Sequence, residues 1–363
     1  MRLFPRSTRI ELKLYFKMLR NRRKYTGLRN SDVVDIFDRL AYISPEMLNV
    51  VNWIRRKPVA AFNPAAVVSG RKLYVFPRII FGYYHYASVV GVFELDIEEL
   101  LSGVKPSEPI DARIVIYPTE TWELALGCED PRVVIDNNMY IVLYTGVSFS
   151  EKNIGDKPHI GISKLYSLQA IAFLDKDMNI LRKDYFKISG YGRYHVPLVW
   201  KDSALLGSGI KRPMLTRPMV FGEEICWRCI ADLDKATAHI DTFEPIFYNE
   251  SWERKVGWST NAVELSSNEY LVGWHGVSKT DGIYRNGLMI VNREGEPQMI
   301  SKYYLLAPRG LEEMYGDRPA VIFGDGLVKY KEKIIWVGGV SDHAIGIFAA
   351  DIEKIMEHMK DIK

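Results

Sequence analysis

Two adjacent acids, Glu129 and Asp130, precede a proline and an arginine in the stretch "CEDPR". Pro131 has a fixed backbone and also restricts the residue before it. The β-branched run "VVID" that follows predicts that a strand begins here. A carboxylic acid held rigidly at the entrance to a sheet is either a structural anchor or a proton donor, and this stretch alone leaves both interpretations open.

Other polar and charged residues stand at the ends of predicted strands along the chain. They are Asn63 in "FNPAAV", Arg78 in "VFPR", Lys201 and Asp202 in "WKDSALL", Arg217 in "LTRP", Lys255 in "RKVGW", His275 in "GWHGV", Tyr284 in "IYRNG" and Asp342 in "GGVSD". Taken singly, each has a structural interpretation, because an Asn-Pro pair makes a turn and a strand-end aspartate caps a loop. They share a chemistry only if the fold brings the strand ends together.

The chain beyond about residue 50 predicts an all-β fold. Short segments of alternating apolar residues recur between Gly, Asn, Asp and Pro, and "VVIDNNMYIVLYTG" is typical of a hairpin with an Asn-Asn turn. Hairpins that repeat at blade-like intervals favour a β-propeller over a sandwich. In a propeller the inner strands of all blades converge on one axial pocket, so distant polar residues would meet there.

Residues 1–50 have a different pattern. "IELKLYFKMLRNRRKY" and "SDVVDIFDRLAY" carry helical periodicity, and Ser31 is a candidate N-cap for the second helix. We therefore expect a basic helical extension over residues 1–50, a β-rich catalytic domain over residues 51–363, and a short helix near the C-terminus. The basic extension would also suit a membrane surface or RNA, but we interpret it as a contact within a homo-oligomer.

Composition narrows the functional classes. The net charge of +3 on 363 residues gives no general reason to expect a nucleic-acid partner. No apolar run approaches the roughly 20 residues that span a bilayer, and the basic N-terminus lacks the apolar core of a signal peptide. We therefore expect a cytoplasmic protein with no membrane partner. The two glutamines, Gln169 and Gln298, and the abundance of ion-pairing residues are typical of a thermophile.

Cys226 and Cys229 form a C-x-x-C pair in "EEICWRCIADL". A redox or zinc site is one interpretation, but no second C-x-x-C or His pair at ligand spacing accompanies it. The surrounding residues favour a strand, so we predict two buried strand cysteines, no metal site and no cofactor.

The ordered set of motifs resembles glycoside hydrolase family 130, the mannoside phosphorylases and their relatives. The resemblance is in register from about Asn63 to Ala350 and is carried by "EDPRV", "YIVLYTG", "MLTRP", "KVG", "GWHGV", "YRNGLMIVN" and "VIFGDGLV…IIWVGGVSDHAIGIFAAD". It implies a five-bladed β-propeller in which Asp130 is the catalytic acid, acting through a hydroxyl of the mannose. We interpret Glu129 and Arg132 as a structural pair that orients the strand entry.

Inverting cleavage of a glycosidic bond needs a proton for the leaving oxygen and a nucleophile on the opposite face of the sugar. A hydrolase activates water there with a second carboxylate, whereas a phosphorylase takes inorganic phosphate as co-substrate and needs a cationic cradle for it. The resemblance places this phosphate cradle at Arg217, Lys255, His275 and Tyr284. It places contacts to the mannose hydroxyls at Asn63, Arg78, Asp202 and Asp342.

The leading hypothesis is inverting phosphorolysis of β-mannosides to α-mannose 1-phosphate, with β-1,2- or β-1,4-linked manno-oligosaccharides or mannosyl-glucose as substrate. A hydrolase with Glu264, Glu269 or Asp281 as its base, a β-mannosyltransferase and a non-catalytic carbohydrate-binding propeller are the alternatives. "WSTNAVEL" departs from the relatives' usual run after "KVG" and leaves the linkage and acceptor sugar open. We expect burial and Glu129 to raise the pKa of Asp130, with Arg132 opposing them.

Overall fold

The computed structural model describes residues 6–149 and 165–362. Strands dominate these residues, which confirms the all-β prediction, and they form sheets of four, nine, eight and five strands. The helices are α1 (Arg6–Asn21), α2 (Ile97–Leu101), α3 (Gly310–Met314) and α4 (Ile352–Glu357), with 3₁₀ turns η1 (Arg22–Tyr25), η2 (Pro45–Met47), η3 (Thr121–Glu123) and η5 (Ile240–Thr242). No helix in this part of the chain combines the length and apolar character that crossing a bilayer requires.

The strands form five groups. Group 1 holds β2 (Leu48–Val50), β3 (Ala60–Ser69), β4 (Lys72–Ile80), β5 (Ser88–Asp96) and β6 (Ile110–Ile116). Group 2 holds β7 (Gly127–Asp136), β8 (Met139–Phe149), β9 (Leu165–Leu174) and β10 (Ile180–Tyr185). Group 3 holds β11 (Lys187–Gly190), β12 (Arg193–His195), β13 (Trp200–Leu205), β14 (Lys211–Val220), β15 (Glu223–Glu224), β16 (Cys226–Asp232), β17 (Thr237–His239) and β18 (Glu244–Phe247).

Group 4 holds β19 (Glu253–Ser266), β20 (Glu269–Ser278), β21 (Tyr284–Asn292), β22 (Pro297–Ser301) and β26 (Met359–Asp361). Group 5 holds β1 (Asp38–Ile43), β23 (Ile322–Tyr330), β24 (Lys333–Val340) and β25 (Ala344–Asp351). Groups 1 and 2 share the nine-stranded sheet, in which β5 and β7 meet at the single pair Ser88 and Gly127.

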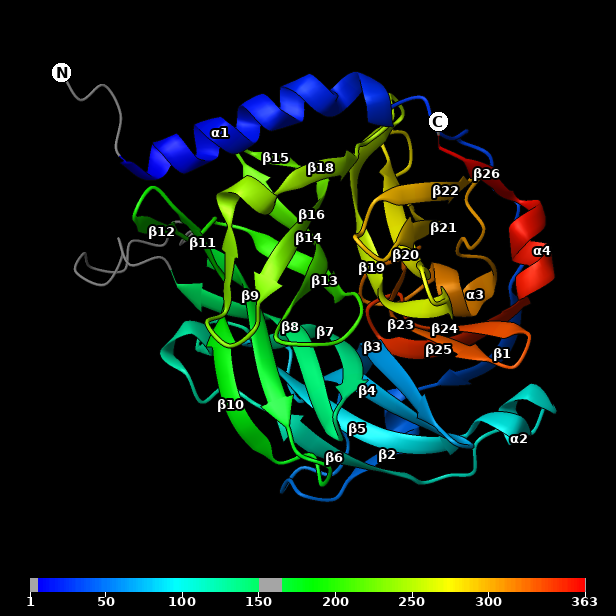
Figure 1. The fold of residues 1–363 in the computed structure, drawn as a ribbon. Helices are drawn as coiled ribbons and strands as arrows, with labels where there is room; N and C mark the ends of the chain where they lie inside the picture. The colour runs from blue at the N-terminus through cyan, green and yellow to red at the C-terminus, as the bar shows by residue number, and fades with distance from the viewer. Residues whose placement is uncertain (1–5, 150–164, 363) are drawn as a thin grey trace.

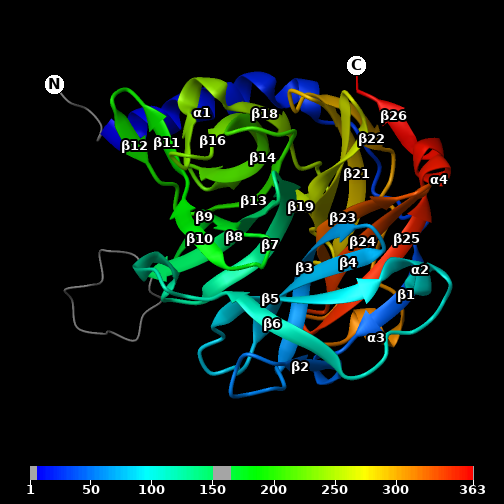
Figure 2. The same cartoon turned by 60° about the horizontal axis from the view of Figure 1, so that its bottom comes forward.

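The innermost strands of the groups, β3, β7, β13, β19 and β23, converge at the centre of the molecule (Figures 1 and 2). Each of these inner strands contacts the next in order, and β23 contacts β3. The groups are therefore arranged around one centre and held there by packing between inner strands, while hydrogen bonds run outward within each group.

The register of every inner strand against its neighbour is interrupted. The interruptions lie between Phe62 and Ala65, Glu129 and Arg132, Lys201 and Ala204, Trp258 and Ala262, and Phe323 and Gly326. Bulges of this kind bend a strand and redirect its side chains. Asn63, Asp130 and Asp202 lie in three of them with φ of 43°, 49° and 55°, in the left-handed region that Asn and Asp tolerate better than most residues.

The hairpin predicted around "VVIDNNMYIVLYTG" is confirmed. β7 and β8 pair from Gly127 to Asp136, and the connecting Asn137 and Asn138 have φ of 49° and 61°. Two left-handed residues in a two-residue connection are the signature of a type I′ turn, which matches the twist of the strands it joins.

The helix predicted over residues 31–42 is wrong. Residues 38–43 form β1, which pairs with β25 from Asp38 against Ala349 to Ile43 against Ile345. This pairing outweighs the local helical periodicity because tertiary context decides such short amphipathic segments. The chain thus joins its beginning to its last long strand, and the boundary predicted at residue 50 does not separate β1 from the sheets.

The other predicted N-terminal helix exists as α1, although residues 1–5 lie outside the described part of the chain. Its spaced residues Ile10, Leu14 and Met18 are each 1% exposed and join the core of group 3. Figure 1 shows α1 lying along that group, close to β15 and β18. One face of α1 therefore packs on its own chain, while Phe16 and Leu19 remain exposed.

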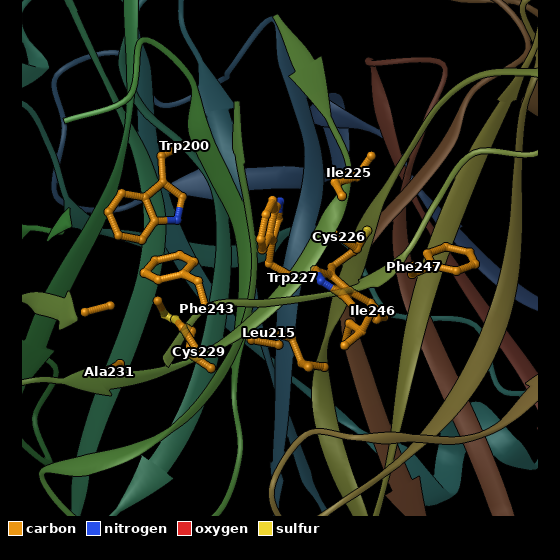
Figure 3. Packing of buried hydrophobic residues seen from close by; sticks show 14 of the residues in the cluster. Trp200, Leu215, Ile225, Cys226, Trp227, Cys229, Ala231, Phe243, Ile246 and Phe247 are labelled. Carbon is orange, nitrogen blue, oxygen red and sulfur yellow. The ribbon is translucent and has the colours of Figure 1, made fainter. Parts of the chain in front are cut away.

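Cys226 and Cys229 are buried, free thiols in β16, which confirms the prediction of buried strand cysteines. They pack among Trp227, Phe243 and neighbouring aliphatic side chains (Figure 3). Burial raises the pKa of both thiols, so neither has the thiolate character that a reactive or metal-binding cysteine needs.

Candidate active site

Asp130 lies at the centre of the molecule, in the bulge of β7, and is 5% exposed. Asn63 Nδ2 donates to its Oδ1 at 2.9 Å, and Arg78 Nη1 donates to the same oxygen at 3.2 Å. Three residues predicted from separate motifs are therefore in contact. With their neighbours they form what we call the acid wall, which comprises Asn63, Arg78, Glu129, Asp130 and Asp342.

Arg78 is the rigid centre of the acid wall. Its Nη2 pairs with Glu129 Oε1 at 2.8 Å, and its Nε donates to Ser88 Oγ at 2.8 Å. Its guanidinium carbon lies 4.9 Å from the centre of the Phe62 ring. One cation therefore holds both carboxylates of the Glu-Asp pair. Glu129 pairs with Arg78 and not with Arg132, so the predicted structural pair is wrong in its partners.

The expected rise in the pKa of Asp130 is also wrong. Burial does raise it, but the nearby cations Arg78, Lys201 and Arg132 outweigh burial and hold the pKa below its ordinary value. Burial raises the pKa of Glu129, despite the opposing charge of Arg78. Of this coupled pair of acids, Glu129 has the higher proton affinity and Asp130 is the carboxylate.

Asp342 reaches the acid wall from the turn between β24 and β25. The turn is anchored to β3, because the backbone N–H of Ala61 donates to the carbonyl of His343 at 3.0 Å. Burial raises the pKa of Asp342 to about 6, against the opposing charges of Arg318 and Arg78.

Groups 3 and 4 supply a second cluster. Tyr284 on β21 stacks on His275 of β20, with ring centroids 5.5 Å apart and planes at 28°. Lys255 Nζ lies 5.1 Å from the centre of the Tyr284 ring. We call this cluster the basic wall, which comprises Lys201, Asp202, Arg217, Lys255, His275 and Tyr284.

Gly257 explains why the lysine motif reads "KVG". A Cβ atom there would lie 2.5 Å from His275 Cε1 and 2.9 Å from Asp202 Oδ2. Glycine is thus required for the close approach of β19 to these two side chains. His275 is fully buried, its Nδ1 lies 3.1 Å from Ser259 Oγ, and its Nε2 has no hydrogen-bond partner within the described residues.

Burial, neighbouring cations or both lower the pKa values of several ionisable groups in the basic wall. Burial and the cations Arg217 and Lys201 together lower the pKa of Lys255 to about 8, against the opposing effect of Tyr284. Burial also lowers the pKa of His275. The pKa of Tyr284 is lowered as well, because Lys255 outweighs the effect of burial. An anion placed here would relieve this mutual repulsion.

Arg217 belongs to the basic wall but already has carboxylate partners. Its Nε and Nη2 lie 2.8 Å and 2.7 Å from Asp202 Oδ2, and its Nη1 pairs with Glu224. The neighbouring charges of Arg217 and Arg132 overcome burial and lower the pKa of Asp202. Glu224 was not among the predicted site residues, and nothing in the stretch "FGEEIC" distinguishes it from an ordinary turn acid.

Arg132 links the two walls. Its Nη1 donates to the backbone carbonyl of Asp130 at 2.9 Å, and its Nη2 lies 3.4 Å from Asp202 Oδ1. Its Nε donates at 2.9 Å to the carbonyl of Ser259, whose hydroxyl contacts His275. The position of the acid is therefore coupled to that of the basic wall through one buried guanidinium.

Two further residues near the walls were missed by sequence reasoning. Asp325 is fully buried in β23 with Oδ1 2.9 Å from Arg132 Nη2, although the contact lacks hydrogen-bond geometry and no described donor reaches either oxygen. Burial raises the pKa of Asp325. Arg318 donates from Nη2 to the hydroxyl of Tyr284 at 3.1 Å. The "GDG" and "DRP" stretches that carry them signal only turns.

The three acids considered as hydrolytic bases lie outside both walls. Glu264 and Glu269 are exposed beside the turn from β19 to β20, at the opposite end of β19 from Lys255. Asp281 pairs with Arg285 at 2.7 Å. Within the described residues, no group of three or more His, Cys, Asp or Glu side chains is placed to hold a metal ion.

Comparison with known proteins agrees with this geometry. The family model described as beta-1,4-mannooligosaccharide phosphorylase matches residues 27–361. Among solved structures, the β-1,2-mannobiose phosphorylase of Listeria innocua, in complex with β-1,2-mannobiose, is 16% identical with a TM-score of 0.66, over 87% of this chain and 96% of that one. The comparison with curated proteins gives no match.

Two other solved structures are similar in fold. A glycosyl hydrolase from Bacteroides ovatus is 15% identical with a TM-score of 0.58, over 91% of this chain and 95% of that one. A structure reported with glycoside hydrolases of the same mannoside phosphorylase family, which target β-1,2 mannosidic linkages in Candida mannan, is 15% identical with a TM-score of 0.58, over 89% and 97% of the two chains. At these identities the likeness shows the fold alone.

Proposed function

Since the chain belongs to glycoside hydrolase family 130, we propose that it catalyses the inverting phosphorolysis of β-mannosides, with α-mannose 1-phosphate and a shortened saccharide as products. The observation that carries this proposal is the combination of one buried acid, Asp130, with a wall of basic groups in which Lys255 forms no ion pair with a carboxylate of the described residues. The largest influences on the pKa of Lys255 are burial, Tyr284, Arg217 and Lys201, and none of these groups is a carboxylate. This charge arrangement favours a bound anion as the second reactant.

In the proposed reaction, phosphate lies against Lys255, His275, Tyr284 and Arg217, and one of its oxygens attacks the anomeric carbon of the mannose. The bond from that carbon to the phosphate oxygen forms as the glycosidic bond breaks, with inversion. The proton from Asp130 reaches the leaving oxygen through a mannose hydroxyl. Asn63, Arg78, Asp202 and Asp342 orient the sugar.

Asp130 must be protonated for this step, although its pKa is lowered in the free protein. Glu129, whose pKa burial raises, shares Arg78 with it and is the nearest store for the proton. A phosphate dianion near Lys201 would offset one of the cations that lower the pKa of Asp130. Phosphate binding would therefore move proton affinity from Glu129 toward Asp130.

We further propose that the five strand groups are the blades of a β-propeller. Residues 51–363 would then supply most of the catalytic domain, and residues 1–50 would be an extension that also adds β1 and β2 to the sheets. The circuit of contacts among the inner strands supports this assignment. Both β-1,2- and β-1,4-linked mannosides stay open as substrates, because the family description and the Listeria phosphorylase structure differ in linkage.

The deciding experiment is incubation with β-1,2- and β-1,4-linked mannobiose, each with and without phosphate. Phosphorus NMR should detect mannose 1-phosphate only in the presence of both substrates, and the anomeric proton signal should report the α configuration. Release of mannose at the same rate in phosphate-free buffer would reject phosphorolysis in favour of hydrolysis.

Hydrolysis is the second candidate, and one observation favours it. Two carboxylates, Asp202 of the basic wall and the neighbouring Glu224, form ion pairs with the guanidinium of Arg217. An inverting hydrolase needs a carboxylate opposite its acid to activate water. The role of Glu224 therefore separates the two functions.

We also propose that the chain forms a homo-oligomer through the outer face of α1, where Phe16 is 60% and Leu19 47% exposed. Deleting the extension would be a poor test, because Arg29 is buried in an ion pair with Glu253. Phe16→Ser with Leu19→Ser keeps the inner face intact. Light scattering should show a smaller particle for this variant, and an unchanged particle mass would reject the contact.

A further inference from the structure

All three nitrogens of the Arg217 guanidinium face carboxylates of the protein itself. Nε and Nη2 share Asp202 Oδ2 at 2.8 Å and 2.7 Å, and Nη1 pairs with Glu224 Oε2. Arg217 is 1% exposed, so bulk water cannot replace its carboxylate partners. A phosphate that binds Arg217 in the proposed reaction must therefore share or replace one of these carboxylates.

The two carboxylates differ in how firmly they are held. The Asp202 side chain is fully buried in the bulge of β13, and Arg132 Nη2 lies 3.4 Å from its second oxygen. The Glu224 side chain is 29% exposed and belongs to the two-residue strand β15. Within the described residues, Arg217 is its only side-chain partner.

The geometry points to Glu224 as an internal anion that competes with phosphate for Arg217. A carboxylate presents oxygens to a guanidinium much as a phosphate does, and a partly exposed ion pair is weak compared with a buried one. We propose that phosphate displaces the Glu224 carboxylate, while Asp202 stays and keeps Arg217 in place. This inference rests on the proposed phosphorolysis and makes Glu224 the residue that sets the phosphate concentration at which the enzyme works.

The two proposed functions predict opposite roles for the Glu224 carboxylate. If Glu224 were the base of a hydrolase, removing its charge would abolish the reaction. If Glu224 competes with phosphate, removing its charge should improve phosphate binding. A single substitution, Glu224→Gln, therefore gives opposite results under the two functions while preserving the size of the side chain.

The matched control is Glu223→Gln. Glu223 is the neighbouring acid in the same short strand, it is exposed, and its side chain takes part in no ion pair or hydrogen bond within the described residues. Both variants change the net charge by the same amount. A general electrostatic effect on phosphate would therefore appear in both, whereas a specific release of Arg217 would appear only in Glu224→Gln.

The experiment measures phosphorolysis of mannobiose against phosphate concentration for the wild type and both variants. We expect the KM for phosphate to fall about two- to fivefold in Glu224→Gln, the range for loss of a partly exposed ion pair, with the KM for mannobiose unchanged. Glu223→Gln should match the wild type. An unchanged or higher KM for phosphate in Glu224→Gln would overturn the proposal, as would loss of cleavage at every phosphate concentration.

A binding measurement separates this inference from the proposed function. Calorimetric titration of inorganic phosphate into Asp130→Asn, with and without Glu224→Gln, needs no turnover. Tighter phosphate binding in the double variant supports competition even if the wild type proves to cleave another glycoside. Equal binding in the two proteins rejects it even if phosphorolysis is established. Thermal melting of each variant checks that both remain folded.

Discussion

The acid wall and the basic wall are both largely buried, but they differ in how their charges are balanced. In the acid wall, one guanidinium, Arg78, contacts two carboxylates, whose pKa values are shifted in opposite directions. In the basic wall, Arg217 is neutralised by protein carboxylates, whereas Lys255 pairs with no carboxylate in the described part of the chain and its pKa is lowered to about 8. We therefore predict that an added anion stabilises the basic wall more than the acid wall.

The residues of the two walls also come from different strand groups. The acid wall comes mainly from groups 1 and 2, which share one sheet, and the basic wall comes from groups 3 and 4. Arg132 is the physical connection between them, since it contacts the Asp130 backbone and the Asp202 side chain. The comparison therefore predicts separable defects in proton donation and in phosphate binding, and a combined defect when the connection is cut.

The largest effect is expected at the acid. Asp130→Asn cannot donate a proton, so kcat/KM for phosphorolysis should fall about 10²- to 10⁴-fold, the usual contribution of a general acid. Glu129→Gln keeps the donor and should cost less while changing the acidic limb of the pH–rate profile. Initial rates across pH for both variants make the comparison. Retention of most activity in Asp130→Asn would remove this residue from the mechanism.

Removing Arg132, which connects the two walls, should lower the stability of the protein and change the KM values for both substrates. Arg132→Leu leaves Asp202 without one cation and three backbone carbonyls without a donor. Loss of one partner from a buried ion pair costs about 3–5 kcal/mol, so denaturant unfolding should show a loss of this size. A variant of wild-type stability with normal KM values for both substrates would show that the two walls are positioned independently.

A change confined to the basic wall should act on phosphate alone. Lys255→Met removes the unpaired cation while keeping an apolar stem of similar length. A hydrogen bond to a charged group contributes about 1.5–3 kcal/mol, so the KM for phosphate should rise roughly 10- to 100-fold, with the KM for mannobiose little changed. Steady-state kinetics with each substrate varied in turn provides the test. An equal rise in both KM values would contradict the division into two walls.

The same lysine predicts a pH dependence. Because the pKa of Lys255 is lowered to about 8, it is charged below this pH and neutral above it. The KM for phosphate should therefore rise as pH increases through about 8. Lys255→Arg stays charged at all accessible pH values, so its rise should move to higher pH. An identical alkaline limb in the wild type and Lys255→Arg would assign the titration to another group.

The smallest effect is expected at Asp325. Burial raises its pKa in the folded protein, so its contribution to stability is present at low pH and declines as pH rises through the folded pKa. Asp325→Asn is neutral at every pH and should lose less stability on alkalinisation than the wild type. Melting temperatures from pH 5 to pH 9 measure this difference. A variant that melts much lower at every pH would show that the charge of Asp325 is needed.

Much of the fold was readable from local sequence because its determinants are local. Alternating apolar residues and the Asn137–Asn138 turn predict the β7–β8 hairpin, and the spacing of Ile10, Leu14 and Met18 predicts α1. Residues 38–43 could not be read in this way, since they form a strand only by pairing with β25, some three hundred positions later in the chain. Local periodicity carries no information about such a distant partner.

The candidate site likewise has features that local sequence determines and features that depend on distant parts of the chain. The motifs by themselves determined which side chains were available, from Asp130 and Arg78 to Lys255 and Tyr284. Only the tertiary structure decided their charges and partners, because a pKa depends on burial and on every charge nearby. Arg78 therefore contributes most to the lowered pKa of Asp130, where the sequence had predicted a raised one. Similarly, Arg217 was predicted to bind phosphate, but in the fold it pairs with Glu224. Sequence specifies the groups, but their electrostatic state is set by distances that exist only in the folded chain.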